Sequence, residues 1–81
     1  MTEGDIAQFI EAKSKADEKL DRAIALPQNP QSFETKSAYQ DAIAEYHKAL
    51  GFAFKDGEAH VSVHRQLIRA YFNLGILTER Q

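Results

Sequence analysis

Two histidines one helical turn apart, His60 and His64, are the residues whose spacing could do chemistry. Side chains at positions i and i+4 of an α-helix stand one above the other, which is a common geometry for a pair of metal ligands. A metal ion would need a third or fourth ligand, and only His47 or a carboxylate from another helix could supply it. The structural alternative is that both rings pack at the mouth of a helical bundle, near Phe52 and Phe54. We favour this structural role over a metal site or a pH-sensitive contact, and we expect no cofactor.

The sequence carries none of the common signatures of catalysis. It contains no glycine-rich phosphate loop, no Ser-His-Asp order and no pair of carboxylates with catalytic spacing. It also contains no cysteine, so neither disulfides nor thiolate metal sites can supplement the core. We therefore expect a protein that is not an enzyme.

Charge and hydropathy narrow the expected partners and location. Ten basic and twelve acidic residues are mixed along the chain and leave a net charge of -2. This balance disfavours electrostatic attraction to nucleic acid or anionic lipid. No apolar run approaches the ~20 residues of a membrane span, and the acidic start lacks the basic region of a signal peptide. With the absence of cysteine, these features predict a cytoplasmic protein without a membrane segment.

Two turn signals divide the chain into three stretches with helical periodicity. They are Pro27-Gln28-Asn29-Pro30 and Lys55-Asp56-Gly57. We predict helices over about residues 5–26, 30–54 and 58–79, with Asn29 as the N-cap of the second. A chain of 81 residues suits one small domain. The predicted fold is therefore all-α, a small antiparallel bundle of about three helices within a single domain over residues 1–81.

Apolar stripes on the first two helices are expected to form the core. The stripe of the first helix is Ile6, Phe9, Ile10, Ala16, Leu20, Ala23 and Ile24; that of the second is Tyr39, Ala42, Ile43, Tyr46, Leu50 and Ala53. Lys13 and Asp17 intrude on the first stripe one turn apart, a spacing at which they could pair. Phe52 is expected to point away from the second stripe.

The third predicted helix carries more apolar surface than two neighbours in a small bundle require. Its polar arc is narrow and consists of Ser62, Arg65, Gln66, Arg69, Asn73 and Arg80. Phe72 and Ile76 lie one turn apart near one border of the apolar arc, towards Arg65 and Arg69. We hypothesise that these four residues contact a partner chain or a second subunit. The alternative is that Phe72 and Ile76 cover the ends of the bundle or sit partly exposed, as many apolar residues do.

Two short motifs resemble those of known helical families. The run Tyr39-x-x-Ala42-Ile43-x-x-Tyr46-x-x-Ala49-Leu50 resembles the second helix of a tetratricopeptide repeat, and Tyr71-x-x-Leu74-Gly75 resembles its first helix. The 29 residues from Ala42 to Tyr71 depart from the roughly 18 that a regular 34-residue repeat needs. The same middle helix, within three antiparallel helices, also resembles a microtubule-interacting-and-trafficking (MIT) domain. Members of that family hold a helical peptide in a groove between helices, so the resemblance implies a groove along the third helix.

These patterns predict a small helical protein–protein interaction module without a catalytic role. Its partner would be a helix or peptide of another protein, or a second copy of itself, bound along the third helix. One alternative is an obligate homodimeric regulatory or accessory protein, such as a phage or secretion protein. The other is a metal-dependent activity at His60 and His64.

Overall fold

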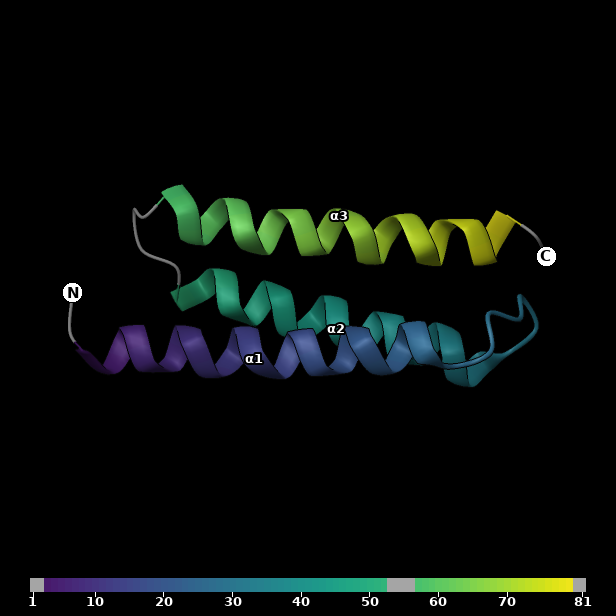
Figure 1. Cartoon of the computed structure of the whole chain (residues 1–81), viewed down its shortest axis with the longest axis horizontal. Coiled ribbons are helices and arrows are strands. Elements are labelled where there is room, and N and C mark those ends of the chain that lie inside the picture. Colours follow the sequence, from purple (N-terminus) through teal and green to yellow (C-terminus); the bar gives the residue numbers. More distant parts are fainter. Residues whose placement is uncertain (1–2, 53–56, 80–81) are drawn as a thin grey trace.

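The computed structural model describes residues 3–52 and 57–79, which form three helices. They are α1 (Glu3–Ala25), α2 (Phe33–Phe52) and α3 (Gly57–Glu79), and consecutive helices run antiparallel (Figure 1). No strand occurs over these two ranges, so the prediction of a small all-α bundle is confirmed. None of the helices in the described ranges is both long and apolar enough to cross a membrane. Ala53, Phe54 and Arg80, which carried sequence-based predictions, lie outside the described residues.

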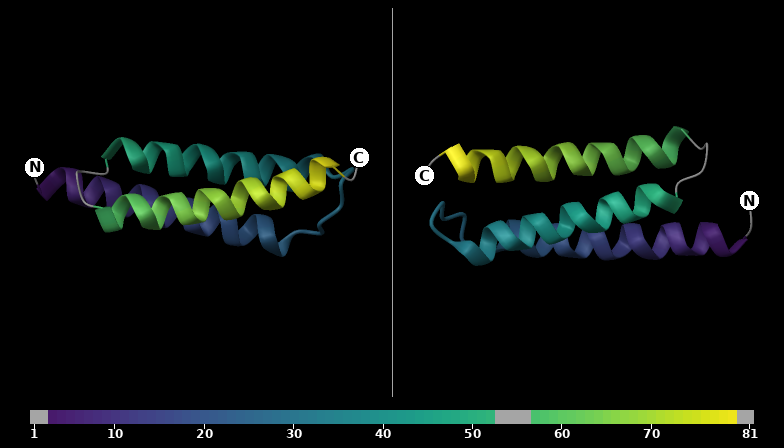
Figure 2. Two further views of the ribbon diagram at one scale, coloured as in Figure 1. Left: turned by 90° about the horizontal axis from the view of Figure 1, so that it is seen from above. Right: turned by 180° about the vertical axis from the view of Figure 1, so that it is seen from behind.

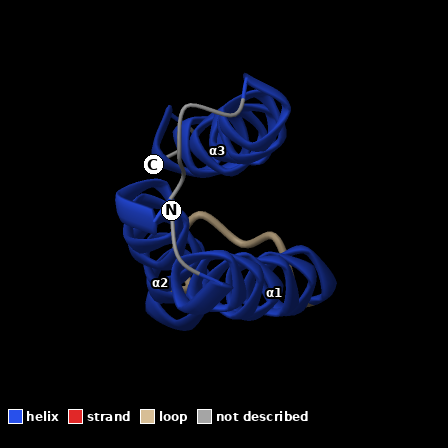
Figure 3. Cartoon of the chain, turned by 90° about the vertical axis from the view of Figure 1, so that its left-hand side faces the viewer, coloured by secondary structure: helices blue, strands red, loops and turns tan. Residues whose placement is uncertain are grey.

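The three helices form an L in cross-section rather than a closed triangle. Viewed along the helices, α2 lies at the corner, with α1 and α3 as the two arms (Figure 3). The packing agrees with this view, because α2 contacts both other helices along its length whereas α1 and α3 barely touch. The molecule measures 45 × 18 × 15 Å. One side of it, between α1 and α3, is therefore open.

The loop between α1 and α2 ends in a capped helix start that differs from the prediction. The Ser32 hydroxyl accepts a hydrogen bond from the Thr35 amide at 3.2 Å, so Ser32 is the N-cap of α2. The prediction that Asn29 is the N-cap is therefore wrong. The side-chain oxygen of Asn29 instead accepts the Gln31 amide at 2.9 Å and closes a local turn, which delays the start of the helix to Phe33.

Two polar side chains tie this loop to the bundle. The Gln28 amide nitrogen donates to the Ala23 carbonyl at 2.9 Å, where it satisfies a backbone group at the end of α1, and the Gln28 side-chain oxygen accepts from the Tyr39 hydroxyl at 2.7 Å. The buried hydroxyl of Thr35 donates to the Pro27 carbonyl at 2.8 Å. The connection is thereby held against the first turns of α2.

The core combines large rings on α2 with small side chains around them. The buried apolar residues are Phe9, Ala12, Ala16, Leu20 and Ala23 on α1, Tyr39, Ala42, Ile43, Tyr46 and Ala49 on α2, and Val63, Leu67, Ala70 and Leu77 on α3. Alanines allow helix backbones to approach closely, and the tyrosine rings fill the space that remains. The central position of α2 follows from this pattern, since it supplies the two largest fully buried side chains, Tyr39 and Tyr46.

Three apolar residues occupy positions that differ from the prediction. Ile6 and Ile10, expected in the core, are 44% and 58% exposed. They lie exposed because α3 covers α2 and leaves this side of α1 open. Phe52, expected to point away, is half-buried and packs against the core.

Tyr46→Ala should lower the free energy of unfolding by about 3–5 kcal/mol, since it removes a fully buried ring at the centre of the bundle. Tyr71→Ala is the matched control, because the Tyr71 ring is 51% exposed and its loss should cost about 1 kcal/mol or less. Urea denaturation followed by circular dichroism measures both. Equal losses in the two variants would contradict a core centred on α2.

Candidate functional site

The carboxylate of Asp17 connects all three helices. One of its oxygens accepts hydrogen bonds from the Tyr46 hydroxyl of α2 and from the Gln66 amide of α3, the latter at 3.3 Å. The other oxygen pairs with the Lys13 ammonium group at 3.0 Å, so Lys13 and Asp17 do pair, as their spacing allows. This half-buried carboxylate therefore links α3 to the α1–α2 hairpin.

Burial and hydrogen bonding act in opposite directions on the acidity of Asp17. Burial by itself raises the pKa of the carboxyl group, but the hydrogen bonds from Tyr46 and Lys13 outweigh it, and the net pKa lies below its ordinary value of 3.8. Burial and the adjacent Asp17 carboxylate both raise the pKa of Tyr46 above its usual range. At neutral pH the proton therefore stays on the tyrosine and the charge on Asp17, which suits a structural role.

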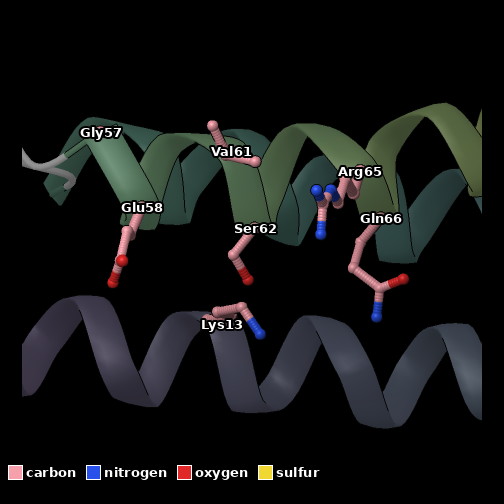
Figure 4. A pocket seen from close by; sticks show the side chains of 7 residues that line it. All are labelled: Lys13, Gly57, Glu58, Val61, Ser62, Arg65 and Gln66. Atoms are coloured by element: carbon pink, nitrogen blue, oxygen red, sulfur yellow. The ribbon is translucent and has the colours of Figure 1, made fainter.

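An open pocket of about 540 Å³ lies beside this network, between α1 and α3. Lys13 reaches into it from α1, while Glu58, Ser62 and Gln66 project from α3 towards α1 (Figure 4). Its other lining residues are Gly57, Val61 and Arg65. The floor of the open side is thus polar, with apolar residues at its edges.

The four residues predicted to bind a partner lie together on one face of α3, and one of them, Arg65, lines this pocket. Arg65, Arg69, Phe72 and Ile76 follow one another at steps of four, three and four, so they share one helix face. Phe72 is 66% exposed, both arginines are exposed, and Ile76 is half-buried. Neither arginine forms an ion pair within residues 6–52 and 57–79. Their role in binding stays a prediction, but the structure leaves the face accessible.

Other exposed apolar side chains lie outside this group. Val61, which lines the pocket, is 49% exposed, and Ile68 and Tyr71 on α3 are 69% and 51% exposed. Phe33 is 82% exposed and lines a second open pocket, of about 440 Å³, beside α1 and α2. The sequence analysis did not predict that Phe33 is exposed. Its exposure could have been inferred from its position just after the Ser32 cap and off the apolar stripe of α2.

The two histidines differ in environment. Their rings stack with centroids 6.4 Å apart and an interplanar angle of 20°. His60 is half-buried and His64 is exposed. The expectation that both rings pack in the bundle is therefore wrong for His64. The contact face of α3 centres on Val63 and Leu67, and this turns His64 towards solvent.

The structure does not assemble a metal centre from the described part of the chain. His47, one of the groups that could have supplied a third ligand, contacts the Tyr71 hydroxyl at 3.1 Å. No group of three His, Cys, Asp or Glu residues among those described could hold a metal ion. His60 and His64 remain a stacked pair on one helix.

Comparison with known proteins identifies no relative of this chain. No protein-family model, curated protein or solved structure matches this chain. The resemblances to tetratricopeptide repeats and to MIT domains stay predictions. Functional proposals therefore depend on the surface of the molecule itself.

Asp17→Asn should lower the free energy of unfolding by about 1–2 kcal/mol at neutral pH. It weakens charged hydrogen bonds, and solvent screens part of that loss at this half-buried site. A carboxylate with a lowered folded-state pKa stabilises the fold above its unfolded pKa and loses this contribution as pH falls through the folded value. The difference from the native chain should therefore be constant above about pH 5 and shrink below about pH 4.

Denaturant titrations across this pH range measure the effect. The control is Glu11→Gln, which alters an exposed pair with Lys15 at 3.7 Å and should cost under about 0.5 kcal/mol. A deficit for Asp17→Asn that persists unchanged in acid would show that shape, and not charge, accounts for it.

Proposed function

We propose that the chain is a protein–protein interaction module whose α3 binds an amphipathic helix of a partner. The observation that carries this proposal is the face of Arg65, Arg69, Phe72 and Ile76 on α3, three of whose residues are exposed and whose Arg65 lines the open pocket between α1 and α3. Binding surfaces commonly combine aromatic and arginine side chains in this way, with an apolar centre and a charged border.

The free energy of burying exposed apolar side chains on α3 supports the same proposal. Burying an aromatic side chain such as Phe72 against a partner contributes roughly 1.5–3 kcal/mol. A single exposed apolar residue needs no explanation. On this face, however, Phe72 is 66% exposed beside two exposed arginines and the half-buried Ile76. The helix gains most from a partner that covers this surface.

The border of the face selects the chemistry of the partner. Arg65 and Arg69 are exposed on α3, and neither forms an ion pair within residues 6–52 and 57–79. Positive groups at the rim favour a helix with acidic residues beside its apolar stripe. Such a helix would lie against both arms of the L, at the separations of 8–10 Å typical of packed helices.

Other features agree with this proposal. A helix bound at the open side resembles the mode of peptide binding in MIT domains, and the cysteine-free composition suits a reducing cytoplasm. A second copy of the chain is the alternative occupant of the same face. No specific observation favours a metal-dependent activity at His60 and His64.

Helical peptides selected from a displayed library against the chain provide the test. We expect acidic amphipathic sequences, and Phe72→Ser with Ile76→Ser should weaken their binding by about tenfold to a hundredfold, because the apolar centre is lost. Phe72→Ser alone is measured as well, since Ile76 is half-buried and its loss could affect folding.

Phe33→Ser is the matched control, because Phe33 is equally aromatic and more exposed, at 82%, but lies off this face. Circular dichroism confirms that each variant is folded, and calorimetry measures the dissociation constant. Binding that survives both α3 variants, or that depends on Phe33 instead, would exclude this face as the binding site.

A further inference from the structure

A stripe of residues runs along the face of α3 that points away from the bundle. Its members are all exposed and follow one another at intervals of four, three, four, three and four residues. They are Val61, Arg65, Ile68, Phe72, Gly75 and Glu79, which we call the outer stripe. The α3 residues that pack in the core, such as Val63 and Ala70, lie on the opposite face of the helix. Alternating intervals of four and three are typical of the seam along which two helices coil around each other.

No described part of the chain covers the outer stripe. α3 is one arm of the L, with its far side open (Figure 3), and seen from above it runs in front of the other two helices (Figure 2). Ile68 and Phe72, at the middle of the stripe, are 69% and 66% exposed, and Val61 is 49% exposed. A single exposed apolar residue is ordinary, but three in one line along a helix form a surface that a second helix can cover.

Gly75 lies in the outer stripe although the fold of the chain does not require a glycine there. A methyl group at this position would meet no described atom within 4 Å, and the backbone has no positive φ. Glycine inside a helix is less favourable than alanine. On an exposed face, however, the missing side chain leaves room for a long side chain of another helix. Contact with another chain would therefore give this glycine a role.

We propose that two copies of the chain dimerise by packing their outer stripes together, with the two α3 helices antiparallel. The inference rests on the proposed function, since it names α3 of a second copy as the helix that α3 binds. A two-fold axis perpendicular to α3 produces this arrangement and presents the same stripe from both copies. Because the stripe faces away from the bundle, α1 and α2 of each copy lie behind the contact and leave it unobstructed (Figure 3).

One register brings the apolar centres of the two stripes together. Its two-fold axis lies halfway between Ile68 and Phe72, so Ile68 of each copy packs against Phe72 of the other. Arg65 then lies opposite Gly75 of the other copy, where the missing side chain makes room for the arginine stem. Both helices rise by ~1.5 Å per residue, so the intervals of the two stripes stay in step along the contact.

The charges of the outer stripe select the antiparallel orientation. In this register Arg65 lies one helical turn, ~6 Å along the axis, from Glu79 of the other copy, within reach of its long side chain. In a parallel pair, Arg65 would instead face Arg65 and Glu79 would face Glu79, and like charges repel. Both residues are exposed, and neither forms an ion pair among the described side chains of residues 6–52 and 57–79.

The small size of the contact sets its expected strength. The outer stripe spans ~27 Å of helix, and each copy contributes only this one helix. Such a contact is at the small end of specific protein–protein interfaces, where association is weak and transient. We therefore expect a reversible dimer that forms in the micromolar range and not an obligate one.

Sedimentation equilibrium from about 1 μM to 1 mM should show a monomer–dimer equilibrium for the native chain. Ile68→Ser with Phe72→Ser should weaken dimerisation by more than about a hundredfold, because each dimer loses four apolar side chains from its centre. Phe33→Ser is the matched control and should leave dimerisation unchanged, since Phe33 is 82% exposed but lies on α2. Circular dichroism checks that each variant is folded.

Charge reversal tests the orientation of the two helices. Arg65→Glu and Glu79→Arg should each weaken dimerisation by about tenfold, because like charges then meet twice across the two-fold axis. A chain that carries both changes should dimerise as the native chain does. The two positions are 14 residues apart, or ~21 Å along one helix, so this restoration requires contact between copies. Asp41→Arg reverses an exposed charge on α2 and should have no effect.

Three outcomes would overturn the inference. They are a chain that stays monomeric up to about 1 mM, a dimer that survives the two serine changes, and single charge reversals that the double reversal fails to restore. In each case, selected helical peptides that lose affinity through Phe72→Ser would leave the proposed function standing. Dimers that behave as expected, beside a library that yields no binding helix, would confine the function of α3 to self-association.

Discussion

A charged carboxylate links the three helices at the point where they meet. Asp17 belongs to α1, accepts the hydroxyl of a fully buried tyrosine on α2, and accepts the Gln66 amide of α3. α1 and α3 make few contacts, and hydrophobic packing alone has no fixed direction. The hydrogen bond from Gln66 to Asp17 adds a directional contact between these two helices, and the salt bridge to Lys13 favours the charged form of the carboxylate.

The open side is a consequence of the same arrangement. With α3 resting on α2, the α1 surface around Ile10 and the α3 surface around Phe72 lose the apolar cover that a closed triangle of helices would provide. A domain of this size buries only a modest share of its surface, so uncovered apolar area weighs heavily on its stability. The proposed partner helix would cover part of this apolar area.

Local patterns in the sequence predicted what depends on neighbours along the chain. Helical periodicity and turn residues were sufficient for three helices, and the four-residue spacing was sufficient for the pairing of Lys13 with Asp17. The predicted cap at Asn29 failed because two nearby side chains could serve, and the choice of Ser32 depends on the path of the loop. The predictions for Phe52 and His64 were wrong for a different reason. A helical wheel shows which residues share a face of one helix, but not which face packs against a neighbouring helix.

The sequence by itself determined the fold class, the α2 core residues from Tyr39 to Tyr46 and the grouping of Arg65, Arg69, Phe72 and Ile76, since all of these follow from periodicity within one helix. Tertiary structure decided that α2, and not α3, is central, and that Ile6 and Ile10 face solvent beside the open side. It also decided that Asp17 serves three helices, because its contacts with Tyr46 and Gln66 span 29 and 49 residues of chain. Contacts across such separations depend on how helices pack against one another, and the period of a single helix carries no information about that.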